Sequence, residues 1–164
     1  MGFPPIENPN AKVLILGSMP GIASLRAGQY YAHPRNQFWP IMGALLGHNL
    51  AELAYPERVQ CLIDAGIALW DVLQSCQRPG SLDADIAPAS IIANDFATFF
   101  VLHPAITHVY FNGTAAERHF NQRVRPLLQT RPVHYLRLPS TSPAHAALNY
   151  PAKLDAWRVL LACT

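Results

Sequence analysis

The sequence predicts an α/β protein of three layers, in which helices cover both faces of a four-stranded parallel sheet. Four short apolar segments have the length of buried strands, and they cover residues 12–16, 67–73, 107–112 and 133–138. Segments with helical spacing separate them, and a helix between consecutive strands implies a right-handed crossover and parallel pairing. Hydrophobic residues make up 51% of the chain and charged residues only 13%, which indicates a sheet that is buried on both faces.

Five helices are expected, because apolar residues recur at helical spacing between recognisable start and stop signals. Proline begins three of them, an Asn-Asp pair caps one, and a Thr-x-x-Glu capping box begins another. In chain order they cover about 40–46, 56–65, 94–103, 114–125 and 151–161. The last helix is expected to bury a stripe that contains Trp157, Leu160 and Leu161. The segment 74–90 is rich in Pro, Gly, Ser and Asp and predicts an irregular excursion.

The chain of 164 residues is expected to form one domain over 1–164, since that length can bury roughly 70% of its unfolded surface. It contains no apolar run of the roughly 18 residues that a membrane-spanning helix needs, and its N-terminus does not resemble a signal peptide. We therefore expect a soluble, cytoplasmic protein without a membrane partner. The three cysteines are far apart, and neither they nor the histidines have metal-ligand spacing, so no metal or cofactor is indicated.

Basic residues are concentrated in the last third of the chain. Residues 1–112 contain five Lys or Arg against eight Asp or Glu, whereas residues 113–164 contain seven against two. Such a segment could contact phosphates, or it could be a solvated basic surface, and the composition alone does not choose between the two.

Polar and glycine-rich segments follow three of the predicted strands at the point where each strand ends. They are the segment 17–39 after the first strand, Asp71 in the second, and the loop 139–145 after the fourth. Because ligands of parallel sheets bind beyond the carboxyl ends of the strands, these segments predict a binding site at that edge.

The sequence Gly-Ser-Met-Pro-Gly at 17–21 is neither a P-loop nor a dinucleotide-binding fingerprint, and its middle residue excludes a nucleophile elbow. Ser18 could still act as a nucleophile with His145 and Asp71, as in a small-molecule serine esterase. Asn36 could orient a water molecule and hold a ligand, or it could brace its own loop. Four aromatic residues, Tyr30, Tyr31, Phe38 and Trp39, lie within ten positions of one another, and at least one is expected to line a pocket for a flat ligand.

Six motifs together identify a resemblance that covers nearly the whole chain. They are Gly-Ser-Met-Pro-Gly-Ile-Ala-Ser-Leu at 17–25, Tyr-Tyr-Ala-His-Pro-Arg-Asn-Gln-Phe-Trp at 30–39, Trp-Asp-Val at 70–72, Asn-Asp-Phe at 94–96, Phe-Asn-Gly at 111–113 and Pro-Ser-Thr-Ser-Pro at 139–143. The chain resembles the uracil-DNA glycosylase superfamily, and within it the hypoxanthine-DNA (DNA-deoxyinosine) glycosylase branch. The resemblance implies a sheet with strand order 2-1-3-4.

The resemblance also implies roles for residues. Met19 occupies the position at which related branches have a water-activating Asn or Asp. In the hypoxanthine branch the Asn of the His-Pro-x-Asn motif carries catalysis, and the resemblance assigns that role to Asn36. Tyr31 falls where a related branch stacks an aromatic ring on the extruded base. The implied base-binding residues are Gly17, Ser18, Met19, Pro20, Gly21, Tyr31, Phe38 and Asp71, although Asp71 could instead terminate its strand. The implied DNA-binding residues are Ser140, Thr141, Ser142, Pro143 and His145.

The function that this resemblance implies is a monofunctional DNA glycosylase of base excision repair, a hydrolase that releases hypoxanthine, uracil or both from deaminated DNA. The implied partner of the monomeric protein is double-stranded DNA, with single-stranded DNA as an open alternative. Lys12 and Lys153 are expected to lie away from the pocket, so no Schiff base and no lyase activity are expected. The alternatives are a DNA-binding relative without catalysis, because Met19 replaces the usual hydrolytic residue, and the Ser18 esterase.

Overall fold

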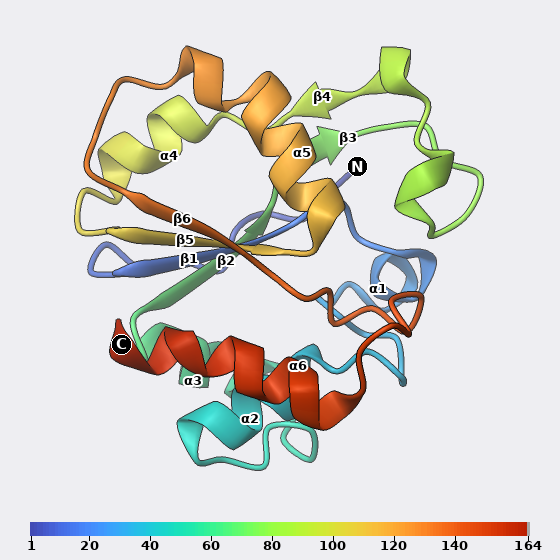
Figure 1. The fold of residues 1–164 in the computed structure, drawn as a ribbon, viewed down its shortest axis with the longest axis vertical. Helices are drawn as coiled ribbons and strands as arrows, with labels where there is room; N and C mark the ends of the chain where they lie inside the picture. Colours follow the sequence, from blue (N-terminus) through green and yellow to red (C-terminus); the bar gives the residue numbers. More distant parts are fainter. Residues whose placement is uncertain (164) are drawn as a thin grey trace.

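The computed structural model describes residues 1–163, and its centre is a four-stranded sheet (Figure 1). The strands are β1 (Val13–Gly17), β2 (Ile67–Asp71), β5 (His108–Asn112) and β6 (His134–Leu138). They lie in the order β2-β1-β5-β6, and every pairing between them is parallel. Counted within this sheet alone, the order is 2-1-3-4, so the predicted α/β architecture and strand order are confirmed.

Helices cover both faces of the sheet, as Figure 1 shows. One layer contains α2 (Phe38–Leu46), α3 (Tyr55–Asp64) and α6 (Tyr150–Trp157), and the other contains α4 (Phe96–Leu102) and α5 (Thr114–Arg123). Successive residues of a strand point to opposite faces, and β1 therefore contributes to two cores. Val13 and Ile15 belong to the core that includes the α2, α3 and α6 side chains, whereas Leu14 and Leu16 belong to the phenylalanine-rich core beneath α4 and α5.

Helix ends follow most of the predicted signals, with one exception at α5. At the start of α4, the Asp95 carboxylate accepts a hydrogen bond from the Thr98 N–H at 3.0 Å, as the Asn-Asp pair predicts. The predicted capping box of α5 is wrong, because Gly113 occupies the cap position with φ 95° and Thr114 is already helical. Glu117 instead pairs with Arg137 of β6, with 3.1 Å between Oε2 and Nη1.

Two further predictions of the element bounds are wrong, and one short helix was not predicted. The second strand ends at Asp71, because Leu73 begins β3 (Leu73–Ser75), which pairs antiparallel with β4 (Ile92–Ala93) in a separate small sheet. The helix α1 (Ile22–Ala27) has no counterpart in the prediction, since six residues are too few to show a helical period. After Trp157 the last helix tightens into the 3-10 helix η4 (Arg158–Ala162), whose different repeat leaves Leu161 45% exposed rather than buried.

The predicted excursion at 74–90 is largely irregular, with two single turns of 3-10 helix, η1 (Asp83–Asp85) and η2 (Pro88–Ser90). It returns to the loop that follows β1, where the Ser18 hydroxyl donates a hydrogen bond to Asp83 Oδ1 at 2.6 Å. The excursion therefore lies beside the carboxyl end of the central strand, which is the edge where the sequence predicts a site. A third short turn, η3 (Arg125–Leu127), follows α5.

None of the helices in residues 1–163 is both long and apolar enough to span a membrane. The three cysteines are free thiols, each half-buried.

Candidate active site

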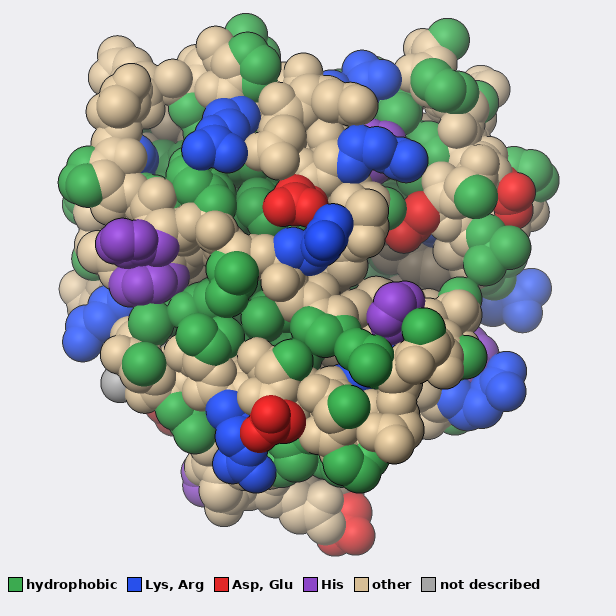
Figure 2. All heavy atoms as spheres, in the orientation of Figure 1, with side chains coloured by type: hydrophobic (Ala, Val, Ile, Leu, Met, Phe, Trp, Pro, Cys, Tyr) green, Lys and Arg blue, Asp and Glu red, His purple; other side chains and the backbone are tan. Residues whose placement is uncertain are grey.

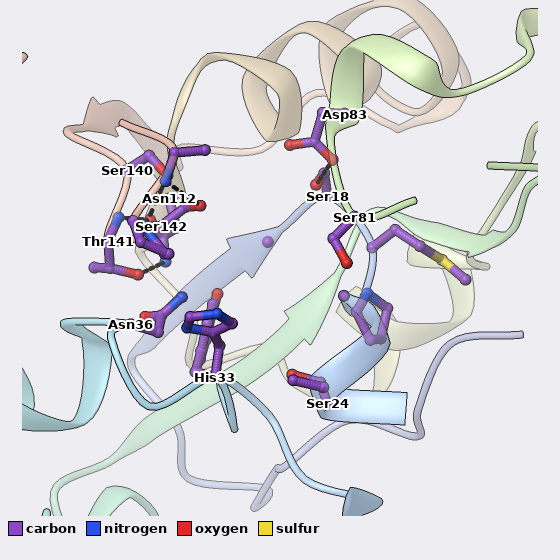
Figure 3. A pocket seen from close by; sticks show the side chains of 18 of the residues that line it. Ser18, Ser24, His33, Asn36, Ser81, Asp83, Asn112, Ser140, Thr141 and Ser142 are labelled. Atoms are coloured by element: carbon purple, nitrogen blue, oxygen red, sulfur yellow. Dashed lines mark hydrogen bonds between the residues drawn. The ribbon is translucent and has the colours of Figure 1, made fainter. Parts of the chain in front are cut away.

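A cavity of about 370 Å³ opens at the carboxyl end of the sheet, where three strands of the sheet end close together. Its lining comes from the loop after β1, the segment 30–36, the excursion, the end of β5 and the loop after β6. Figure 3 shows Asn36 and the residues 140–142 on one side, facing Ser18, Ser81 and Asp83 on the other. The convergence of the strand ends that the sequence predicts is therefore present.

Most of the predicted site residues line this cavity. They are Asn36, Gly17, Ser18, Met19, Pro20, Gly21, Tyr31, Asp71, Ser140, Thr141, Ser142 and Pro143. Phe38 and His145 are absent from the lining. Phe38, predicted to bind the base, is fully buried behind Tyr31 and does not form part of the cavity surface. His145, predicted to contact DNA beside the lesion, lies just beyond the lining residues of its loop, and its backbone carbonyl accepts a hydrogen bond from Lys153.

Gly17 and Asp71 form the floor of the cavity, because β1 and β2 pair in register at these two residues. A side-chain carbon at Gly17 would overlap the Asp71 Oδ1 and lie 3.0 Å from the Tyr31 hydroxyl. Only a glycine therefore lets the carboxyl and the phenol approach the backbone here. The Asp71 side chain in turn is buried, and its Oδ2 has no hydrogen-bond partner among the described residues.

The surroundings of Asp71 at the floor of the cavity raise the pKa of its carboxyl group. Burial, aided by the negative charge of Asp83 and opposed by Arg78, raises the pKa of Asp71 to about 7. At neutral pH roughly half of these side chains would then carry a proton. An unpartnered buried acid that lies in a cavity is typical of a functional site, because a purely structural role would leave its hydrogen-bonding capacity unused.

Tyr31 forms part of the cavity wall and is backed by a second ring. Its ring stacks on Phe38 with 4.1 Å between the centroids, and its backbone has the left-handed φ of 54°. The hydroxyl is buried without a hydrogen-bond partner among the described residues, and burial raises the pKa of this phenol. A residue other than glycine at positive φ is strained, so the surrounding packing holds the ring in place.

Asn36 both braces its loop and lines the cavity. Its side-chain oxygen accepts the N–H of Phe38 at 3.0 Å, which supports the first turn of α2. The bracing role that the sequence left open is therefore present. The Nδ2 group has no hydrogen-bond partner within residues 1–163, and it remains available as a donor, while the oxygen retains a second lone pair.

The loop 139–145, which we call the braced wall, is attached to the rest of the domain at several points. The Asn112 side chain forms two hydrogen bonds of 2.9 Å with Thr141, one to its hydroxyl and one from its N–H. Trp157 donates to the Pro139 carbonyl at 2.9 Å, and the buried Lys153 donates to the His145 carbonyl at 2.8 Å. These anchors come from β5 and α6, so the loop is fixed by both the sheet and a helix layer.

The opposite side of the cavity, which we call the excursion wall, consists of residues 78–85. The buried Arg78 guanidinium donates to the Pro20 carbonyl at 2.5 Å and contacts Asp83 Oδ1 at 3.3 Å. Ser81 accepts the N–H of Ile22 at 2.9 Å. This wall was not predicted, since no local signal in the sequence indicates that the excursion returns to the loop after β1.

The partner of Ser18 contradicts the esterase alternative. Its hydroxyl donates to Asp83, a residue 65 positions away, and forms no hydrogen bond with either His145 or Asp71. The predicted triad is therefore not assembled within the described residues. Met19 lines the cavity and also packs against the core beneath α4 and α5, as expected for an apolar residue.

Most basic residues of the last third have structural partners rather than forming one patch. Arg131 donates to the carbonyls of Phe100, Pro104 and Ile106, and Arg125 lies over the Tyr135 ring. On the face in Figure 2, Lys and Arg side chains lie in separate small groups. At the cavity itself the exposed cation is Arg35, which precedes Asn36. Among residues 1–163, no group of three or more His, Cys, Asp or Glu side chains could hold a metal ion.

Comparisons with known proteins match nearly the whole chain. A family model described as the uracil DNA glycosylase superfamily matches residues 4–161. A Methanosarcina acetivorans protein named hypoxanthine DNA glycosylase is 37% identical over 144 residues, which cover 88% of this chain and 87% of that protein. A Methanosarcina barkeri protein of the same name is 40% identical over 112 residues, or 68% of this chain and 70% of the relative.

A solved structure has the same fold. It is a solution NMR structure described as a candidate uracil DNA glycosylase from Methanosarcina acetivorans, and it matches with a TM-score of 0.79 and 32% sequence identity. The match covers 98% of this chain and 97% of that chain.

Proposed function

This chain belongs to the uracil DNA glycosylase superfamily, and we propose that it is a DNA glycosylase that removes deaminated bases during base excision repair. The observation that carries the proposal is the likeness to proteins named hypoxanthine DNA glycosylase, one of which matches 88% of the chain. Hypoxanthine in DNA is therefore the proposed substrate, with uracil as the second base to test. Duplex DNA is the proposed partner of a monomeric enzyme that works beside the cell's DNA, in the cytoplasm.

Access to the cavity requires the damaged nucleotide to leave the helix. An enzyme that acts on a base must turn it out of the stack, at a cost that is smallest for a mispaired base. Tyr31 supplies an aromatic face on which the extruded base can stack, and Phe38 holds that ring from behind. The small polar side chains of Ser140 and Ser142 would contact the DNA beside the lesion, whereas Thr141 is fully buried and hydrogen-bonded to Asn112 and would hold the loop in place.

Asp71 is proposed to recognise the edge of the base. Hypoxanthine and uracil each present a ring N–H beside a carbonyl oxygen. A protonated carboxyl group can accept from that N–H and donate to that oxygen at the same time, so a pKa of about 7 suits both bases. Its unpartnered Oδ2 and its burial support this role, because the base would satisfy a group that is otherwise left without a partner.

The proposed reaction is hydrolysis of the N-glycosidic bond. As that bond breaks, its electron pair leaves with the base, and positive charge develops on the sugar carbon. The Asn36 Nδ2 group and backbone N–H groups of residues 17–21 would stabilise the negative charge on the departing base. Water adds to the sugar carbon, and its proton leaves to the base nitrogen. Asn36 is proposed to position that water through the free lone pair of its oxygen, since Met19 cannot.

Strand cleavage is not part of the proposal. Neither Lys12 nor Lys153 lines the cavity, and Lys153 is bound to a carbonyl behind the braced wall. No lysine amine is therefore in a position to form a Schiff base with the sugar, and we expect a product with an intact, abasic strand.

The test is single-turnover release of the base from duplexes that contain one deoxyinosine or one deoxyuridine. The wild-type protein should release hypoxanthine, and Asn36→Ala should lose at least about a hundredfold in rate, the usual effect of removing one aimed donor. Asn10→Ala, at an exposed position near the opposite end of the sheet, should keep the wild-type rate.

Two outcomes would contradict the proposal. Full activity in Asn36→Ala would remove the catalytic role of Asn36. Absence of release from both wild-type reactions, with retained binding to the damaged duplex, would favour the DNA-binding relative without catalysis.

A further inference from the structure

A buried serine on α1 contributes a hydroxyl group to the cavity. Ser24 is only 6% exposed, yet it lines the cavity, and in Figure 3 it lies on the same side as Ser81, across from Asn36. It belongs to the motif at 17–25, and no step of the proposed reaction uses it. A hydroxyl group that is buried in a binding cavity costs free energy unless its hydrogen-bonding capacity is used.

The hydrogen bonds around Ser24 leave its hydroxyl as a donor. The oxygen accepts the N–H of Ala32 at 3.2 Å, which joins α1 to the segment that contains Tyr31 and Asn36. The O–H of Ser24 donates to no group within residues 1–163. Because one lone pair of the oxygen is already occupied, the group that remains to be satisfied is the hydrogen. The cavity therefore presents a fixed donor here, which suits a ligand with an acceptor atom.

The residues beside Ser24 do not compete for this donor. Ala23 and the 53% exposed Leu82 also line the cavity, but their side chains neither donate nor accept hydrogen bonds. Ser81 resembles Ser24, since its oxygen accepts the N–H of Ile22, but Ser81 is exposed and water can satisfy its hydrogen. Ser24 is therefore the buried serine whose donor depends on the ligand.

Hypoxanthine and uracil differ in the acceptor that they can offer to this donor. With the N–H and carbonyl edge of the base at Asp71 and the sugar at the mouth, one remaining edge faces Asn36 and the other faces Ser24. On one of these edges hypoxanthine has the acceptor N3 and uracil the acceptor O2. Asn36 is proposed to act on either base, so we assign this shared edge to Asn36. The opposite edge, with N7 in hypoxanthine and only C–H groups in uracil, then faces Ser24.

Resting on the proposed function, we propose that the Ser24 hydroxyl donates a hydrogen bond to N7 of the extruded hypoxanthine and makes the cavity select this purine over uracil. Uracil would leave the buried hydroxyl without an acceptor, and a site built around a hydrogen bond rejects a ligand that cannot form it. Adenine and guanine also carry N7, so this contact separates bicyclic from monocyclic bases and does not itself recognise deamination. Ser24 is thus a specificity residue, which contacts the base and takes no part in bond cleavage.

Replacement of one atom of the base tests the contact directly. The experiment compares equilibrium binding to duplexes that contain hypoxanthine, uracil, or 7-deazahypoxanthine, in which a C–H group replaces N7. A 2′-fluorinated sugar at the lesion makes the N-glycosidic bond resistant to hydrolysis, so that binding rather than release is measured. The wild-type protein should bind the hypoxanthine duplex about tenfold more tightly than the 7-deaza duplex, which is the factor that one hydrogen bond supplies.

Variants of Ser24 show whether this hydroxyl is the donor. Ser24→Ala should bind the hypoxanthine duplex about tenfold more weakly than the wild-type protein, and it should bind the hypoxanthine and 7-deaza duplexes within about twofold of each other. Its affinity for the uracil duplex should stay within about twofold of wild type. Ser24→Thr keeps the hydroxyl and should keep most of the preference for N7. Ser75→Ala, at a half-buried serine of β3 that does not line the cavity, is the matched control and should match wild type.

Two results would overturn the assignment. Equal binding of hypoxanthine and 7-deazahypoxanthine by the wild-type protein would mean that N7 has no donor. Equal weakening of Ser24→Ala on all three duplexes would mean that Ser24 only supports the segment 30–36 through the N–H of Ala32. Failure of the proposed function looks different, since the wild-type protein would then release no base from a cleavable deoxyinosine duplex and would bind damaged and undamaged duplexes alike.

Discussion

The two walls of the cavity are stabilised in different ways. The braced wall, residues 139–145, is bound by side chains of the sheet and of the α6 layer, namely Asn112, Lys153 and Trp157. The excursion wall, residues 78–85, is bound to the neighbouring loop through Arg78, Ser81 and Asp83. One wall is therefore an extension of the folded core, and the other is a surface segment attached to a loop. The first should open only when the domain unfolds, whereas the second can open locally.

The walls also differ in their effect on the floor between them. Asp83 of the excursion wall raises the pKa of Asp71, and Arg78 opposes it, whereas no charged group of the braced wall contributes to that shift. Charged groups of the excursion wall thus influence the pKa of Asp71, whereas the braced wall contributes to the shape of the cavity.

The largest expected effect is the removal of an anchor of the braced wall. Asn112→Ala deletes both hydrogen bonds to Thr141, which is fully buried. The backbone N–H of Thr141 is then left without a partner. We expect the free energy of unfolding to fall by about 3 kcal/mol, from two lost bonds and one buried unsatisfied donor. Urea denaturation measures this value, with Asn121→Ala on the exposed face of α5 as the control. A loss as small as that of Asn121→Ala would contradict the attachment of the braced wall to the folded core.

The second effect concerns the floor and its response to pH. The folded-state pKa of Asp71 is raised from 3.8 to about 7, so its protonated form favours the folded state. The stability that it contributes is complete below about pH 4 and is lost as the pH rises toward 7. We expect the free energy of unfolding to fall by about 2–3 kcal/mol between pH 5 and pH 8 because of this group. Asp71→Asn should remove that part of the pH dependence in urea denaturation at the two pH values, and an unchanged slope would contradict the raised pKa.

The smallest expected effect is the loss of one bond of the excursion wall. Ser18→Ala removes the hydrogen bond to Asp83, a half-exposed partner that water can satisfy. We expect a loss of about 1 kcal/mol or less in the free energy of unfolding. Hydrogen exchange should be faster in residues 78–85 and unchanged in 139–145. Base release should persist. Covalent labelling of Ser18 in the wild-type protein by a serine-reactive phosphonate would restore the esterase alternative.

Local patterns in the sequence were sufficient for the sheet and for the position of the site. Apolar runs of strand length located β1, β2, β5 and β6, and their alternation with helices implied parallel strands. Parallel strands place their carboxyl ends at one edge of the sheet, so the sequence predicted that the segment 17–39, Asp71 and the loop 139–145 meet at that edge. These inferences need only the residue types within a few positions of each other, which is the range over which helix and strand propensities act.

Tertiary structure decided which of the candidate residues reach the cavity. Phe38 and Tyr31 belong to the same aromatic segment, yet one is fully buried and the other lines the cavity. Their separation depends on the positive φ of Tyr31 and on the start of α2, and neither has a sequence signal that would distinguish the two rings.

The motifs themselves thus determined the family and the edge of the sheet that binds the ligand. Only the tertiary structure decided that the excursion forms a wall of the cavity, that the Asp71 Oδ2 has no hydrogen-bond partner among the described residues and that Leu82 is exposed. The physical reason is the distance along the sequence over which each kind of interaction acts. Strand and helix signals come from neighbouring residues, whereas the bond between Ser18 and Asp83 joins residues 65 positions apart. Contacts of that kind exist only after the chain has closed around its core, and the burial that raises the pKa of Asp71 arises at the same step.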